Sequence, residues 1–171
     1  AFDGRFVAWS PSGSRLLYAE SEGPSETSEA WLSEFATRDF FVAQNDGTGS
    51  QWLGEGYAAA WSPDGEQVAT ISSEPLLMVH DLATGRKTTL MDQEGLREAL
   101  DFTQPYFKAS EQPFQLAWSP DGEWIALGAT EGEEETRWET AVLLAKADEH
   151  RLLRKEHGGL MHLAWAPNGR W

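Results

Sequence analysis

The chain has 171 residues, with 28 acidic and 13 basic side chains and a formal net charge of −15. Such a surface repels the phosphates of nucleic acids and anionic lipids, so we expect no nucleic-acid partner. Cysteine is absent, which excludes disulfides and thiolate metal sites, and no apolar run approaches the roughly 18 residues of a membrane-spanning helix, so we expect no membrane insertion.

One motif recurs four times along the chain. It reads WSPSG at 9–13, WSPDG at 61–65, WSPDG again at 118–122 and WAPNG at 165–169, so its tryptophans are 52, 57 and 47 residues apart. Proline ends the short strand before it because it cannot donate to a β-ladder, and the step into glycine supplies a tight hairpin turn. The residues for which we expect this structural role are Trp9, Pro11, Gly13, Trp61, Pro63, Asp64, Gly65, Trp118, Pro120, Asp121, Gly122, Trp165, Pro167 and Gly169.

Each complete repeat continues with three more predicted strands. In chain order they read RLLYAE, DFFVAQ and QWLG, then QVATIS, LLMVHD and KTTLM, then WIALGA, AVLLAKA and RLLRK. Four strands per repeat of this length are typical of a propeller blade. The sequence therefore predicts an all-β fold, in which residues 1–171 are a β-propeller segment of four-stranded antiparallel blades. We place blades at 6–57, 58–113 and 114–161 and the start of a fourth at 162–171.

The motif resembles the blade signature of TolB-type, WD-repeat-like propellers. Residues 61–65 and 118–122 match that signature in full, whereas the first copy departs at Ser12 and the fourth at Ala166 and Asn168. The resemblance implies a bacterial protein of the periplasm or cell surface. It also implies more blades than this chain holds, so we expect the remaining blades to come from the same longer chain or from another copy. The same blades form the propeller of prolyl-oligopeptidase-type peptidases.

Three long insertions interrupt the strands, at 20–38, 93–113 and 130–139. All are second-to-third-strand or blade-to-blade connections, so strand parity predicts that they leave the propeller on one face, opposite the short turns. Together they carry −10 of the net charge, and residues 93–101 could form one or two helical turns within the second. The candidate partner-binding residues on this face are Trp31, Phe35, Tyr106, Phe107, Glu133, Glu134, Glu135 and Trp138. The competing interpretation is that the acids only solvate long loops and the aromatics pack beneath them.

Catalytic and metal signatures are missing from the sequence. There is no G-x-S-x-G nucleophile elbow, no phosphate-binding G-x-x-x-x-G-K-[ST] and no H-E-x-x-H, and the four histidines lack metal-ligand spacing. We therefore expect no catalytic residue, no metal and no cofactor.

Three functions remain open at this stage. The first is a non-catalytic interaction module that binds a protein or peptide, including a basic one, through its acidic long-loop face. The alternative is the gating propeller of a prolyl-oligopeptidase-type serine peptidase whose catalytic domain lies outside this chain. A third is a propeller enzyme that acts on small molecules or sugars, against which no acid can be assigned to the central channel.

Overall fold

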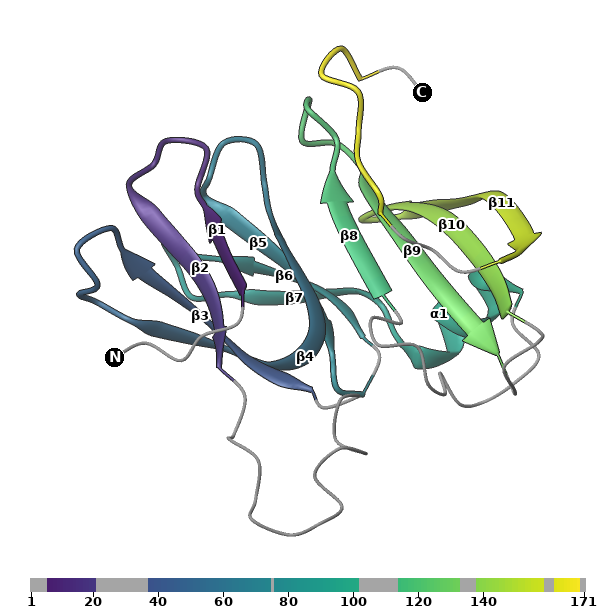
Figure 1. Cartoon of the computed structure of the whole chain (residues 1–171), viewed down its shortest axis with the longest axis horizontal. Helices are drawn as coiled ribbons and strands as arrows, with labels where there is room; N and C mark the ends of the chain where they lie inside the picture. Colours follow the sequence, from purple (N-terminus) through teal and green to yellow (C-terminus); the bar gives the residue numbers. More distant parts are fainter. Residues whose placement is uncertain are drawn as a thin grey trace, which may run out of the picture.

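The computed structural model describes residues 6–20, 37–74, 76–101, 114–132, 138–158 and 162–169. Within these ranges the chain forms eleven strands and one helix (Figure 1). In chain order they are β1 Phe6–Trp9, β2 Arg15–Glu20, β3 Arg38–Gln44, β4 Gln51–Trp61, β5 Gln67–Ser72, β6 Leu77–Asp81, β7 Lys87–Met91, α1 Gln93–Leu100, β8 Phe114–Trp118, β9 Ile125–Gly132, β10 Trp138–Lys146 and β11 Glu149–His157.

The strands pair only with their neighbours in the sequence, and every pair is antiparallel. Strands β1 to β7 make one seven-stranded sheet in chain order, and β8 to β11 make a second sheet of four strands. This up-and-down order, repeated along the chain, is that of β-propeller blades. The prediction of an all-β propeller with about three four-stranded blades and the start of a fourth is confirmed. Blade 1 consists of β1 to β3 and the first half of β4, blade 2 of the second half of β4 and β5 to β7, and blade 3 of β8 to β11.

Strand β4 connects the first two blades without a loop. The sequence predicted QWLG and AAAW as separate strands, but the structure joins them in a single strand of eleven residues. One β-bulge shifts its register against β3 near Gly54, and a second shifts its register against β5 between Gly56 and Ala58. Gly54 has a φ of 141°, which favours glycine, and an added Cβ at Gly56 would lie 2.1 Å from the carbonyl oxygen of Ile71. The two glycines therefore let one strand pass from the outside of blade 1 to the inside of blade 2.

Apolar side chains fill the spaces between blades and form two clusters. The smaller cluster lies between blades 1 and 2 and is built from Leu17, Ala19, Phe40, Val42, Leu53 and Val68. The larger cluster contains residues of blades 2 and 3 together with the helix, among them Ile71, Leu77, Leu96, Leu100, Phe114, Leu127 and Leu143. Each blade is thus covered on a face by its neighbour, and burial of this surface is the main stabilising term of the arrangement.

Helix α1 begins the second insertion, where the sequence indicated helical turns. Asp92 caps its first turn by accepting a hydrogen bond of 2.8 Å from the Gly95 amide, and Asp101 ends it in the left-handed conformation with a φ of 54°. Leu96, Ala99 and Leu100 are buried, so one face of the helix belongs to the larger cluster. No helix among the described residues is long and apolar enough to cross a membrane.

The close approach at Gly56 generates a stability prediction. Replacing Gly56 with Ala should lower the free energy of unfolding by about 3 kcal/mol or more, because the methyl group must displace the β5 backbone to which β4 pairs. Gly47→Ala is the matched control, since that residue also lies in a blade but has open space around its Cβ position. It should cost only the strain of its positive φ, about 1 kcal/mol. Chemical denaturation of the two variants checks this, and an equal loss in both would contradict the steric account.

Candidate binding face and blade junctions

The four motif turns share one backbone geometry. In each, the glycine amide donates to the carbonyl three residues earlier: Gly13 to Ser10 at 2.8 Å, Gly65 to Ser62 at 3.0 Å, Gly122 to Ser119 at 2.9 Å and Gly169 to Ala166 at 2.9 Å. The fourth turn therefore keeps the same bond despite its two sequence departures. The turns of the first three blades all project from one side of the molecule (top in Figure 1), which we call the turn face.

A serine and an aspartate close the two full WSPDG turns. Ser62 Oγ donates to Asp64 Oδ1 at 2.6 Å, and the same oxygen accepts the Glu66 amide at 2.9 Å. Asp121 repeats this with Ser119 and the Glu123 amide. These hydrogen bonds, the serine hydroxyl first, lower the pKa of both aspartates below the usual 3.8. The aspartates of the turn face thus hold turns together.

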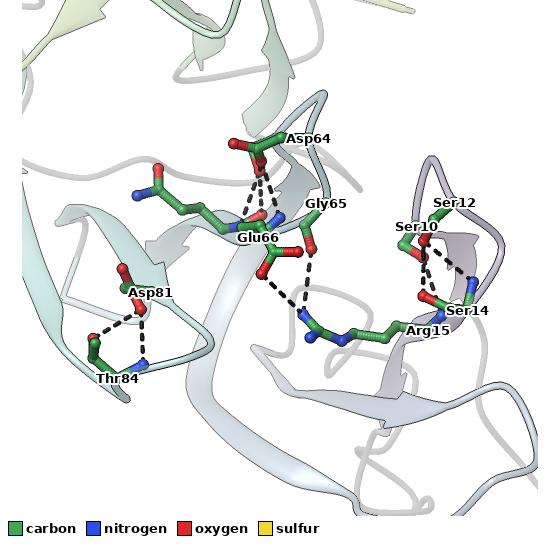
Figure 2. Close-up of polar contacts among 11 residues, drawn as sticks. Ser10, Ser12, Ser14, Arg15, Asp64, Gly65, Glu66, Asp81 and Thr84 are labelled. Carbon is green, nitrogen blue, oxygen red and sulfur yellow. Dashed lines mark hydrogen bonds and ion pairs between the residues drawn. The ribbon is translucent and has the colours of Figure 1, made fainter.

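The first turn substitutes hydroxyls for the carboxylate. Ser12 Oγ lies 3.2 Å from Ser10 Oγ and 2.7 Å from Ser14 Oγ (Figure 2). From this turn Arg15 extends to blade 2, where it contacts the Gly65 carbonyl at 3.4 Å and the Glu66 carboxylate at 3.9 Å. The turn face is therefore also a line of contact between blades.

The strand ends that flank the three insertions lie at the opposite end of the blades. Trp9 pairs with Leu16 beside the first turn, whereas Glu20 pairs with Asp39 at the far end. In blade 3 the far end is the pair of Gly132 with Trp138. We call this end the insertion face, and its position follows the parity argument made from the sequence.

All candidate partner-binding residues except Trp138 lie outside the described residues. This applies to Trp31 and Phe35 in the first insertion, Tyr106 and Phe107 in the second, and Glu133, Glu134 and Glu135 in the third. Trp138 is described only as the first backbone position of β10. The structure therefore locates the strand ends from which these residues depart and leaves their contacts a prediction.

A row of carboxylates crosses blade 1 at the insertion face, and the sequence analysis missed it. Glu20 on β2 pairs with Asp39 on β3, and Asp39 pairs with Glu55 on β4, so three acids occupy adjacent register positions. Like charges directly opposite each other destabilise a sheet. Two of them have polar partners: Asp39 accepts 2.7 Å from Trp52 Nε1, and Glu55 accepts from the Thr37 hydroxyl. Only the strand register brings them together.

Lys155 on β11 joins β10 to the end of α1 at the insertion face of blade 3. Lys155 Nζ lies 3.4 Å from Glu139 Oε2 and 3.4 Å from Asp101 Oδ2, and it also donates to the Asp101 backbone carbonyl. Because Asp101 ends α1, this contact ties the start of the second insertion to β10 and β11. The helix is thus fixed to blade 3 by charge as well as by its apolar face.

Tryptophan hydrogen bonds join consecutive blades along their innermost strands. Trp61 Nε1 donates to the Ala8 carbonyl at 3.1 Å, and Trp165 Nε1 donates to the Ala117 carbonyl at 3.0 Å. Each acceptor is the residue just before the motif tryptophan of the preceding blade. Trp118 departs from the rule, since its buried Nε1 has no partner in the part of the chain that the structure describes.

The outer end of the junction between blades 1 and 2 is held by a lysine. Lys87 on β7 donates to the Leu53 carbonyl on β4 at 2.6 Å, and its ammonium lies 5.4 Å from the ring centroid of Trp52. A cation over an indole face adds an attraction of about 0.5–1 kcal/mol at an exposed site. The junction is therefore polar at both its inner and outer ends.

A buried histidine lies within the same junction. His80 on β6 is 4% exposed, and its Nε2 lies 2.8 Å from Thr70 Oγ1, whereas Nδ1 has no partner among the described residues. Its register partner Val68 belongs to the cluster between blades 1 and 2. Burial first, and the nearby charge of Lys87 second, lower the pKa of His80 from 6.5 to about 4. His80 is therefore neutral at pH 7.

Within the described ranges, no group of three or more histidine, aspartate or glutamate side chains is arranged to hold a metal ion.

The two central tryptophans generate a paired prediction. Trp61→Phe removes a hydrogen bond and leaves the Ala8 carbonyl without its indole donor, whereas Trp118→Phe removes an indole N–H that has no acceptor within the described ranges. The first variant should therefore lose about 1 kcal/mol more unfolding free energy than the second. Denaturation curves of the two variants measure this difference in unfolding free energy. An equal loss would mean that the indole bond contributes nothing to blade stacking.

His80 generates a prediction of pH dependence. Its pKa is lower in the folded protein, so the unfolded state binds more protons between pH 6.5 and about 4. Stability contributed by neutral His80 is complete above pH 6.5 and is lost as the pH falls toward 4, by up to about 3 kcal/mol. Denaturation at several pH values should show this slope in the parent protein and a shallower one in His80→Gln, in which only the carboxylates still contribute.

A direct titration of His80 by NMR checks the same point if the variant fails to fold. A pKa for the His80 ring near 6.5 in the folded protein would contradict the prediction.

Solved structures support the fold by similarity of shape. The chain matches the β-propeller domain of the Trilobed protease from Pyrococcus furiosus with a TM-score of 0.51 at 10% identity, over 89% of this chain and 43% of that one. It matches the Pyrococcus horikoshii acylaminoacyl peptidase with a TM-score of 0.52 at 10% identity, over 91% of this chain and 24% of that one. The chain thus spans less than half of either protein. No protein-family model matches the sequence.

Proposed function

We propose that this chain is a non-catalytic interaction module of a TolB-like propeller protein, and that it binds a basic protein or peptide through its insertion face. The observation that carries the proposal is the separation of roles between the two ends of the blades. On the turn face, Asp64 and Asp121 hold the turns through their own hydrogen bonds. On the insertion face, Glu20, Asp39 and Glu55 form a row of acids that costs sheet stability.

The sequence adds charge and aromatic side chains to that end. The three insertions carry −10 of the total charge of −15, and they contain Trp31, Tyr106 and Trp138. A negative surface accelerates the association of cationic partners, and aromatic anchors contribute much of the affinity at interfaces. A lysine- or arginine-rich segment with an apolar residue fits this combination.

A second candidate function is the gating propeller of a serine peptidase. The similarity to the acylaminoacyl peptidase of P. horikoshii favours it, since the match to that structure covers 91% of this chain. Fold alone does not assign function. The complete protein distinguishes the two proposals: an α/β-hydrolase segment with a nucleophile elbow, joined to this propeller, would select the peptidase.

The binding proposal is tested with two charge-matched variants. One reverses Glu133, Glu134 and Glu135 to lysine on the third insertion, and the control reverses Glu66, Glu123 and Asp148 to lysine at turns of the opposite end. A lysine-rich peptide of about ten residues that contains one tryptophan serves as the probe in a calorimetric titration at low and moderate salt. The insertion variant should weaken binding by about tenfold at low salt, and the control by much less.

A variant at an aromatic residue distinguishes binding to a specific face from attraction by charge alone. Trp31→Ala keeps the net charge and should still weaken binding of the same peptide by several-fold, because an anchoring contact is lost. Equal effects of the two charge-reversal variants, or binding that is indifferent to salt, would contradict the proposal.

A further inference from the structure

The outermost strand of each described blade contains one β-bulge, and the extra residue is a leucine every time. The register of the outermost strand against its neighbour skips Leu53 in β4, Leu90 in β7 and Leu153 in β11. The inner strand pairs among the described residues keep a regular register, apart from β4 with β5, where the chain passes from one blade to the next. The leucine bulge is therefore a repeated feature of the outermost strands.

The hairpin turns before these strands do not determine the bulge. They differ in length, since they consist of residues 45–50, 82–86 and 147–148. The residue that pairs with the last position before each bulge nevertheless lies three residues before the end of its own strand, and these residues are Phe41, Met78 and Leu143. Both the place of the bulge and its leucine are thus kept while the turn varies, which indicates that the bulge itself has a role.

Packing of the leucines accounts for only part of this regularity. Leu53 is 1% exposed and belongs to the cluster between blades 1 and 2. Leu90 is half-buried against the larger cluster, and Leu153 is half-buried between two exposed residues, Leu152 and Arg154. The bulge is therefore present in β11 although its leucine is not a core residue there.

The bulged strands also form the exposed edges of the sheets. Among the described residues, β7 and β11 each end a sheet, and residues 51–54 of β4 pair with β3 on one side only. We call these three outer edges the rim. Each lies at the outside of its own blade, away from the faces on which neighbouring blades stack. An exposed edge offers unpaired backbone N–H and C=O groups to a strand of another molecule.

The bulges interrupt the rim where such a strand would have to pair. Leu153 divides the nine residues of β11 into two runs of four, and β7 keeps only Lys87–Thr89 before Leu90. In β4 the carbonyl of Leu53 already accepts a hydrogen bond of 2.6 Å from Lys87 Nζ. A bulge also bends a strand and increases its twist, so two bulged edges cannot align over their full length.

We propose that the leucine bulges prevent the rim from pairing with the rim of a second copy of this chain. The net charge of −15 also keeps copies apart, but salt screens that repulsion. The bulge is a property of the backbone, so its effect persists at high ionic strength. This inference is independent of the partner proposed for the insertion face.

Deletion of Leu153 tests the proposal on the longest rim strand. The pairs Val142 with Arg154 and Leu143 with Leu152 lie on either side of the bulge, so the deletion joins them in one regular ladder. Leu153→Ala is the matched control, because it removes the side chain and keeps the extra residue. In sedimentation equilibrium at about 0.5 M salt, the deletion should strengthen self-association at least about tenfold over the parent, whereas Leu153→Ala should match the parent. Thermal melts check that each variant is folded.

Hydrogen exchange locates the new contact. Association of the Leu153 deletion should slow exchange of the β11 amides and leave those of β2 and β5 unchanged. Deletion of Leu90, compared with Leu90→Ala, repeats the experiment on β7 if the first deletion does not fold. Equal association of a deletion and its alanine control, or slowed exchange away from the edited strand, would overturn the proposal. Unfolding of both deletions while both alanine variants fold would also overturn it, because the bulges would then be a requirement of folding.

Discussion

Stacking of one blade on the next is the interaction on which the rest of this structure depends. A four-stranded blade is apolar on both faces, as the two clusters on either side of blade 2 illustrate, so it cannot be stable without a neighbour. Strand β4 meets this constraint through the covalent chain, because its glycines let one strand serve two blades. The two indole hydrogen bonds also share a direction, since each runs from a later blade to an earlier one.

The two complete junctions use different chemistry for the same task. The junction between blades 1 and 2 has polar contacts from its inner to its outer end, with Trp61, the Thr70–His80 pair and Lys87 in sequence. The junction between blades 2 and 3 instead relies on a larger apolar cluster that includes α1, and the Trp118 indole nitrogen has no partner among the residues that the structure describes. Apolar burial is not directional, whereas a hydrogen bond requires a specific distance and angle. An apolar junction therefore tolerates a tryptophan whose indole N–H makes no hydrogen bond.

The repeat made the blades and their turns predictable from the sequence, because proline and glycine at fixed offsets dictate local backbone geometry. The continuous β4 was missed because QWLG and AAAW look like separate strands. Gly54 and Gly56 between them were the sequence signal that could have indicated one strand with bulges. His80, Lys87 and the row of Glu20, Asp39 and Glu55 could not be found, since each depends on strand register or on contacts between residues far apart in the sequence. The candidate aromatic and acidic residues of the insertions remain predictions.

If stacking through β4 is the central constraint, blades 1 and 2 should open as one cooperative unit. Native-state hydrogen exchange measures this directly, through the opening free energy of individual amides. The account predicts that the slowest amides of β2 and β3 share one opening free energy with those of β5 and β6. Exchange of β2 and β3 through a lower-energy opening, while β5 and β6 stay protected, would contradict it, because blade 1 would then unfold without disturbing its neighbour.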